Sequence, residues 1–196
     1  MQIKDLFSGR VFTISNFLSV SRIIVAPFTG YMFHMEKTGG GEIYRYYALA
    51  LICVLIASDF LDGFLARALN QVSRLGQFID PMADKITAVI MGVLVCYYKE
   101  FPVWVLVAVL ARDAYSVIGG ILLFTKKDIQ ARPNIYGKLM VVCIGFSGLI
   151  YVMETQVRIL GISLQHISIF LIVFFLVLST LEYWRTYSKV YFEKKR

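Results

Sequence analysis

Six apolar stretches, each long enough to cross a lipid bilayer as a helix, divide this 196-residue sequence. A transmembrane helix needs about 20 mostly apolar residues, and only short polar connections separate the six stretches. The chain is 58% hydrophobic and 17% charged, and a soluble domain this short has no core that could bury so much apolar surface. The sequence predicts an all-α integral membrane protein, one domain over residues 1–196, with six transmembrane helices near 11–35, 44–69, 75–98, 101–124, 136–153 and 159–184.

The first ten residues are amphipathic, with Ile3, Leu6 and Phe7 as the apolar positions, and this pattern predicts a short N-terminal helix on the membrane surface. Thirteen of the 20 Lys and Arg residues lie in this segment, in the second and fourth connections and in the C-terminal tail, against four on the opposite side. Because cytoplasmic loops carry the excess of basic residues, both termini are predicted to be cytoplasmic, in a cell (inner or plasma) membrane. The net charge of +7 then favours anionic lipid as the partner, and no nucleic acid.

Four aspartates inside two neighbouring apolar stretches are the strongest functional signal, because a charged residue near the centre of a lipid-facing helix costs about 2.5–3.5 kcal/mol. Asp59 and Asp62 are three residues apart, and Asp80 and Asp84 are four apart, so each pair lies on one helix face. The short connection between the stretches predicts antiparallel neighbouring helices. At about 1.5 Å per residue, all four carboxylates then reach a similar depth and are expected to share one site.

Four carboxylates in a low-dielectric site need either protons or cations. With no His or Cys nearby, an all-oxygen site favours Mg²⁺, Mn²⁺ or Ca²⁺, and two such ions balance four aspartates. A pair of hard cations suits phosphoryl transfer. Gly63, Ala66 and Gly76 on the same faces leave room for a bulky phosphorylated ligand, Arg67 is placed for a diphosphate, and Ser73 is a predicted helix N-cap.

Two other classes of protein also place charges inside membrane helices. A cation or proton transporter uses buried carboxylates as a relay, and a structural membrane adaptor uses charge pairs such as Arg112-Asp113 for helix association. Ion flux in sealed vesicles without any phosphoryl transfer would identify the transporter. The sequence has no repeated halves, and transport does not explain the spacing of the Gly, Ala and Arg residues around the aspartates.

From Asp59 to Asp84 the sequence matches the pattern D-x2-D-G-x2-A-R-x8-G-x3-D-x3-D at every fixed position. This segment resembles the signature of the CDP-alcohol phosphotransferase family. The resemblance implies a homodimer of six-helix protomers with a site that faces the cytoplasm. It also implies transfer of a substituted phosphoryl group from a CDP-alcohol to an acceptor hydroxyl, with release of CMP.

The same resemblance implies a role for each residue of the motif. Asp59, Asp62 and Asp80 resemble ligands of two divalent cations, Mg²⁺ or Mn²⁺, and Asp84 resembles both the fourth ligand and the general base that takes the proton of the acceptor. The residues implied to bind the CDP-lipid are Asn16, Ser19, Gly63, Ala66, Arg67, Ser73 and Gly76.

Shorter motifs resemble the phosphatidylglycerophosphate synthase branch of the family. The segment N-F-L-S-V-S-R that ends at Arg22, the D-P-M-A-D-K that follows Ile79, Arg112-Asp113 and Gly137-Lys138 are similar to motifs of that branch, although Val141 stands where the branch commonly has Thr. The resemblance implies CDP-diacylglycerol as donor and sn-glycerol 3-phosphate as acceptor. Phosphatidylglycerol, as in a cardiolipin synthase, or serine remains an alternative acceptor. The residues predicted to bind the acceptor phosphate are Arg22, Arg112 and Lys138.

Overall fold

The computed structural model describes residues 14–68, 76–127, 134–159 and 161–192, with the backbone alone for residues 14–16, 59–68, 76–81, 121–127 and 189–192. The predicted surface helix over residues 1–10 lies outside this part of the chain. The described residues are almost entirely helical and divide into two compact units, Met1–Lys99 and Glu100–Arg196. Each unit is built around three long helices.

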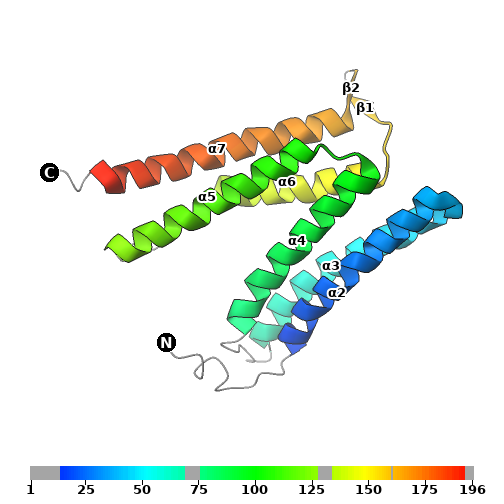
Figure 1. The fold of residues 1–196 in the computed structure, drawn as a ribbon, viewed down its shortest axis with the longest axis horizontal. Helices are drawn as coiled ribbons and strands as arrows, with labels where there is room; N and C mark the ends of the chain where they lie inside the picture. The colour runs from blue at the N-terminus through cyan, green and yellow to red at the C-terminus, as the bar shows by residue number, and fades with distance from the viewer. Residues whose placement is uncertain (1–13, 69–75, 128–133, 160, 193–196) are drawn as a thin grey trace. The chain divides into compact units, whose positions relative to one another are not determined.

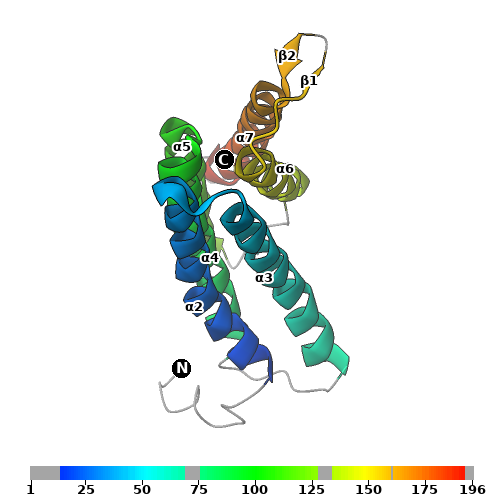
Figure 2. The same cartoon turned by 90° about the vertical axis from the view of Figure 1, so that its right-hand side faces the viewer.

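The first unit contains α2 (Ile14–Met35), α3 (Ile43–Ala68) and α4 (Gly76–Lys99). Helix α2 packs against both of the others, and α3 and α4 run in opposite directions along it (Figures 1 and 2). Small side chains permit this close packing: Ala26, Ala48 and Ala83 are almost fully buried. A Cβ atom on Gly30 of α2 would lie 2.6 Å from a methyl group of Leu94 on α4, so a larger residue at this crossing would require Leu94 to shift.

A single π-helical turn, η1 (Glu36–Gly40), joins α2 to α3. Gly39 and Gly41 have φ angles of 103° and 83°, in the left-handed region that favours glycine. The glycine run from Gly39 to Gly41 therefore reverses the chain where the sequence predicts a connection.

A buried ion cluster ties the three helices together at this same end of the unit. The Lys99 ammonium group at the end of α4 lies 2.6 Å from a Glu36 carboxylate oxygen, and Arg45 Nε donates to the other oxygen at 2.7 Å. The side chain of Lys99 is only 3% exposed, and its charge also lies 5.5 Å from the centre of the Phe33 ring. One carboxylate thus compensates two cations from different helices.

Replacing Glu36 with Gln is expected to lower the apparent melting temperature of the detergent-solubilised protein by about 5–10 °C, because Lys99 and Arg45 then lose the carboxylate that lies between them. Glu42→Gln is the matched control. The Glu42 side chain is 75% exposed and 4.0 Å from Arg45, so its loss should change the melting temperature by less than about 2 °C. Thermal unfolding is measured by intrinsic fluorescence. Equal shifts of the melting temperature in the two variants would contradict this role for Glu36.

The second unit contains α5 (Val103–Lys127), α6 (Ile135–Val152) and α7 (Leu164–Phe192). Helix α7 packs against both α6 and α5. Between α6 and α7, the buried hydroxyl groups of Ser147 and Ser168 are hydrogen-bonded at 2.8 Å. Such short polar contacts stabilise helix pairs in an apolar environment, where hydrophobicity alone does not drive association.

The predicted start of the sixth helix is wrong. Residues 158–163 instead include two short antiparallel strands, β1 (Arg158–Ile159) and β2 (Ile162–Ser163), and α7 begins at Leu164. Gly161 has a φ angle of 82°, which turns the chain between the strands. The Ser163 hydroxyl accepts a hydrogen bond from His166 N at 3.4 Å and caps the helix. Helix α7 also continues past the predicted end, to Phe192.

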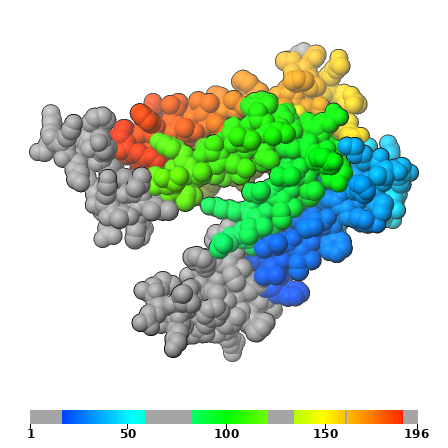
Figure 3. Space-filling view, in the orientation of Figure 1, coloured from blue at the N-terminus to red at the C-terminus, as the bar shows by residue number. Residues whose placement is uncertain are grey.

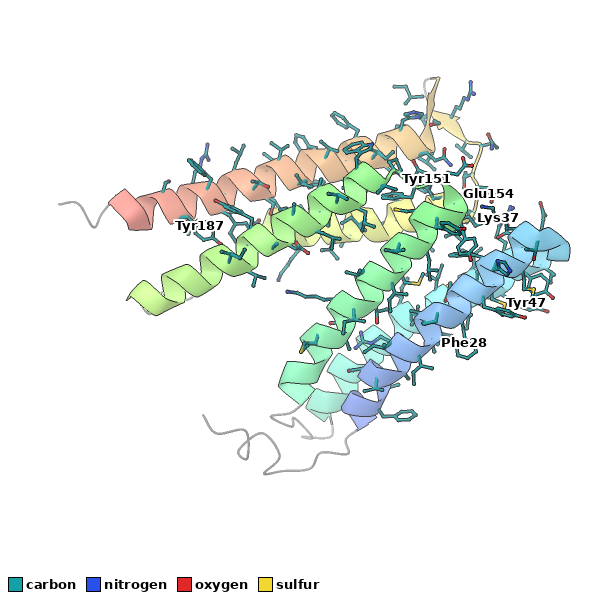
Figure 4. The ribbon with its side chains drawn as sticks, viewed as in Figure 1. Phe28, Lys37, Tyr47, Tyr151, Glu154 and Tyr187 are labelled. Atoms are coloured by element: carbon teal, nitrogen blue, oxygen red, sulfur yellow. The ribbon has the colours of Figure 1, made fainter. Side chains whose placement is uncertain are left out.

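Large apolar side chains cover the outer faces of the helices. On α2 and α3, Phe28 and Tyr47, labelled in Figure 4, are more than half exposed, and so are Phe146 of α6 and Phe170 of α7. Of these helices, α2 in blue and α7 in orange to red can be followed in Figure 3. Such surfaces are rare in soluble monomers and typical of lipid-facing helices. Within the described residues, the segments long and apolar enough to cross a membrane are Val103–Gly120, Ile135–Val152 and Leu164–Ser188.

Candidate active site

The aspartates of the motif lie on two helices of the first unit. Asp59 and Asp62 belong to the last turns of α3, and Asp80 and Asp84 to the first turns of α4. The end of α3 and the start of α4 lie at the same end of α2 (Figures 1 and 2). The antiparallel direction of the two helices is therefore confirmed. The side chains of Asp59, Asp62 and Asp80 are outside the described residues, so their convergence on one site stays a prediction.

Asp84, the predicted general base, is paired with a buried arginine. Arg22 Nη1 of α2 lies 2.7 Å from Asp84 Oδ1, and Arg22 Nη2 donates to the Ser19 hydroxyl at 3.3 Å. The side chain of Arg22 is 4% exposed, whereas that of Asp84 is 48% exposed. The carboxylate thus has a buried partner on α2 and is itself about half exposed. The structure brings together three residues to which the resemblance gives separate roles.

The chemistry of the donor set fits hard divalent cations. The four aspartates supply oxygen ligands alone, with spacings that place each pair on one face of a described helix. The half-exposed carboxylate of Asp84 is accessible to an ion. Among the side chains that the structure describes, no group of three His, Cys, Asp or Glu residues is suitable for a metal ion. Three of the four predicted ligands, Asp59, Asp62 and Asp80, have side chains that the structure does not describe.

Arg112, predicted to bind the acceptor phosphate, is the centre of a polar cluster in the second unit. Its Nη1 lies 2.8 Å from Asp113 Oδ1, and its Nη2 donates to the Ser179 hydroxyl on α7. The guanidinium carbon lies 5.1 Å from the centre of the Tyr183 ring. A Cβ atom on Gly137 of α6 would meet Arg112 Nη2, so a larger residue at this position would require the Arg112 guanidinium group to shift.

The first turn of α6 carries Lys138 beside this cluster. Asn134 precedes the helix, and its side-chain oxygen accepts a hydrogen bond from Gly137 N at 3.1 Å. Lys138 is exposed, unlike the buried Gly137 next to it. Arg112 and Lys138 belong to the second unit and Arg22 and Asp84 to the first. That all of them serve one acceptor stays a prediction.

Sequence reasoning missed Asn134, Ser179 and Tyr183. A signal was present for two of them, because Asn134 follows Pro133 directly before an apolar helix and Ser179 interrupts an otherwise apolar run. Of the residues predicted to bind the CDP-lipid, Ser19 is described and fully buried. Ser73 lies outside the described residues, and only the backbone is described for Asn16, Gly63, Ala66, Arg67 and Gly76.

Comparison with known proteins shows which family this chain resembles. Residues 12–181 match the sequence model of the CDP-alcohol phosphatidyltransferase family. A CDP-diacylglycerol–glycerol-3-phosphate 3-phosphatidyltransferase of Aquifex aeolicus is 34% identical over 166 residues, which cover 81% of this chain and 89% of the relative. The protein of the same name from Escherichia coli K12 is 34% identical over 126 residues, or 63% of this chain and 65% of the relative. A cardiolipin synthase (CMP-forming) of Streptomyces coelicolor is 34% identical over 111 residues, or 57% and 51%.

Proposed function

This chain belongs to the CDP-alcohol phosphatidyltransferase family, and we propose that it transfers the phosphatidyl group of CDP-diacylglycerol to sn-glycerol 3-phosphate. The products are phosphatidylglycerophosphate and CMP. The observation that carries this choice of acceptor is the likeness to the Aquifex aeolicus relative, which extends over 89% of that protein. The motifs around Arg22 and Asp84 agree with it, and the contact between these two residues supports a shared site.

In the proposed reaction, Asp84 accepts the proton of a glycerol hydroxyl group. The hydroxyl oxygen attacks the phosphorus atom of the phosphatidyl group, and the bond from that phosphorus to the CMP oxygen breaks. Arg22, which itself donates a hydrogen bond to Ser19, holds the Asp84 carboxylate. Two divalent cations, when bound by the four aspartates, neutralise the diphosphate and the charge that develops on departing CMP. In the proposed site, Arg67 and Ser73 bind the diphosphate.

The acceptor phosphate is proposed to bind Arg112 and Lys138, because a guanidinium and an ammonium group suit a phosphorylated alcohol. Gly137→Ala is a test of this role. The new methyl group would displace Arg112 Nη2, so the KM for glycerol 3-phosphate is expected to rise about tenfold. Gly145→Ala on the same helix meets open space and should leave this KM unchanged. Equal values in the two variants would contradict the assignment of Arg112.

Membrane arrangement and assembly complete the proposal. We propose six spans with both termini in the cytoplasm, so that the aspartates lie on the cytoplasmic side of the cell membrane, where CDP-diacylglycerol and glycerol 3-phosphate meet. The match to a single family model over residues 12–181 supports one domain over residues 1–196. We also propose a homodimer, which light scattering of the detergent-solubilised protein tests directly.

The decisive experiment is an acceptor assay with the purified protein. CDP-diacylglycerol is supplied with labelled glycerol 3-phosphate, phosphatidylglycerol or serine, and CMP and lipid products are measured. Product from glycerol 3-phosphate alone supports the proposal. Product from phosphatidylglycerol alone would favour the cardiolipin synthase alternative, which the Streptomyces coelicolor relative represents. Ion flux in sealed vesicles without CMP release would overturn the phosphatidyltransferase reaction in favour of transport.

A further inference from the structure

One buried hydroxyl group joins all three helices of the second unit. Ser179 Oγ on α7 accepts hydrogen bonds from Arg112 Nη2 on α5 and from Asn134 Nδ2, the latter at 3.0 Å. The Ser179 carbonyl oxygen accepts a further bond from the same amide group at 3.0 Å. Ser179 is fully buried. Its hydroxyl thus connects Arg112 to the residue that precedes α6.

Asn134 also forms hydrogen bonds with the first turn of α6. Its side-chain oxygen accepts from Gly137 N at 3.1 Å, and its carbonyl oxygen accepts from Lys138 N at 3.2 Å. The amide group of Asn134 therefore bonds to Ser179 with its nitrogen and to the helix with its oxygen. The position of the Lys138 backbone depends on the same residue that contacts Ser179.

Arg112 retains a donor that suits an anion. A guanidinium group has five N–H donors, and the contacts with Asp113 and Ser179 use its two Nη atoms. The side chain is 9% exposed, and among the described residues none accepts a hydrogen bond from its buried Nε. Because a buried donor without a partner is costly, an anionic oxygen at this position would stabilise the arrangement.

We propose that Ser179 and Asn134 are positioning residues that set the affinity for the phosphorylated acceptor. They hold the Arg112 guanidinium group and the first turn of α6 in one fixed geometry, so that Arg112 and Lys138 meet a phosphate group without rearrangement. This inference rests on the proposed function, since it deepens the acceptor site named there. In this proposal both residues act through Arg112 and the first turn of α6 and not on the reacting atoms.

The test compares Ser179→Ala with Ser168→Ala. Both serines are buried and both bond across an interface of α7, but Ser168 contacts Ser147 instead of the Arg112 cluster. Ser179→Ala is expected to raise the KM for glycerol 3-phosphate on the order of tenfold, while kcat and the KM for CDP-diacylglycerol change less than about twofold. Ser168→Ala should leave all three parameters at the wild-type values. An equal rise in both variants, or none in Ser179→Ala, would overturn the proposal.

Asn134→Ser keeps the test decisive if Ser179→Ala does not fold. Serine preserves an oxygen for the N-cap of α6 but lacks the amide group that reaches Ser179. The same selective rise in the acceptor KM is expected, and an unchanged value would overturn the role of Asn134.

Direct binding of glycerol 3-phosphate, measured by calorimetry, separates this inference from the proposed function. Wild-type binding that weakens in Ser179→Ala supports the positioning role even if no phosphatidylglycerophosphate forms, whereas absence of that product overturns only the proposed reaction. Equal affinity in wild type and Ser179→Ala would overturn the positioning role.

Discussion

Replacing Asp84 with Asn is expected to reduce kcat about a thousandfold, while CDP-diacylglycerol still binds. The amide group has the shape of the carboxylate and keeps an oxygen that accepts from Arg22, but it cannot take a proton from the acceptor hydroxyl. The measurement is CMP release under saturating substrates, with binding of the CDP-lipid followed separately by thermal shift.

Arg22→Lys is the companion variant for this experiment. Lysine keeps a positive charge but loses the fork that contacts both Asp84 and Ser19. A smaller loss of kcat, on the order of tenfold, is expected, because Asp84 remains present but less firmly oriented. If Asp84→Asn retained more than about a tenth of the wild-type kcat, Asp84 would not be the base.

Removal of divalent cations with EDTA is expected to abolish turnover, and Mg²⁺ or Mn²⁺ should restore it. Four aspartates that face a diphosphate without cations repel both the substrate and one another, so the loss should exceed about a thousandfold. A second readout is independent of activity: Mn²⁺ should raise the melting temperature of wild type but not that of Asp59→Ala. Full activity in excess EDTA, or an equal shift in both proteins, would contradict the cation site.

The positions of the helices were largely predictable, because each long apolar segment between two polar connections predicts one helix. The start of α7 was an exception, since Ile159 and Ile162 suit a strand as well as a helix, and the turn at Gly161 separates them. Apolar pattern alone does not distinguish these outcomes over so few residues.

Contacts between helices were not predictable from the pattern. Lys99 and Arg45 counted only as basic residues on one side of the membrane, yet they share the Glu36 carboxylate in a buried cluster. In the same way, the sequence indicated that Arg112 was functional without indicating Ser179, which is distant in sequence. Helical periodicity identifies a face of one helix, whereas the partner of that face depends on packing between segments.

The ion cluster at Glu36 has a mechanical consequence for the helices of the first unit. Because Lys99 and Arg45 fasten α4 and α3 to the end of α2, separation of these helices is costly at that end. Nearer the other end of α2, the ion pair of Arg22 with Asp84 joins α2 to α4 a second time. Two ionic contacts at different levels thus resist separation of α2 from α4.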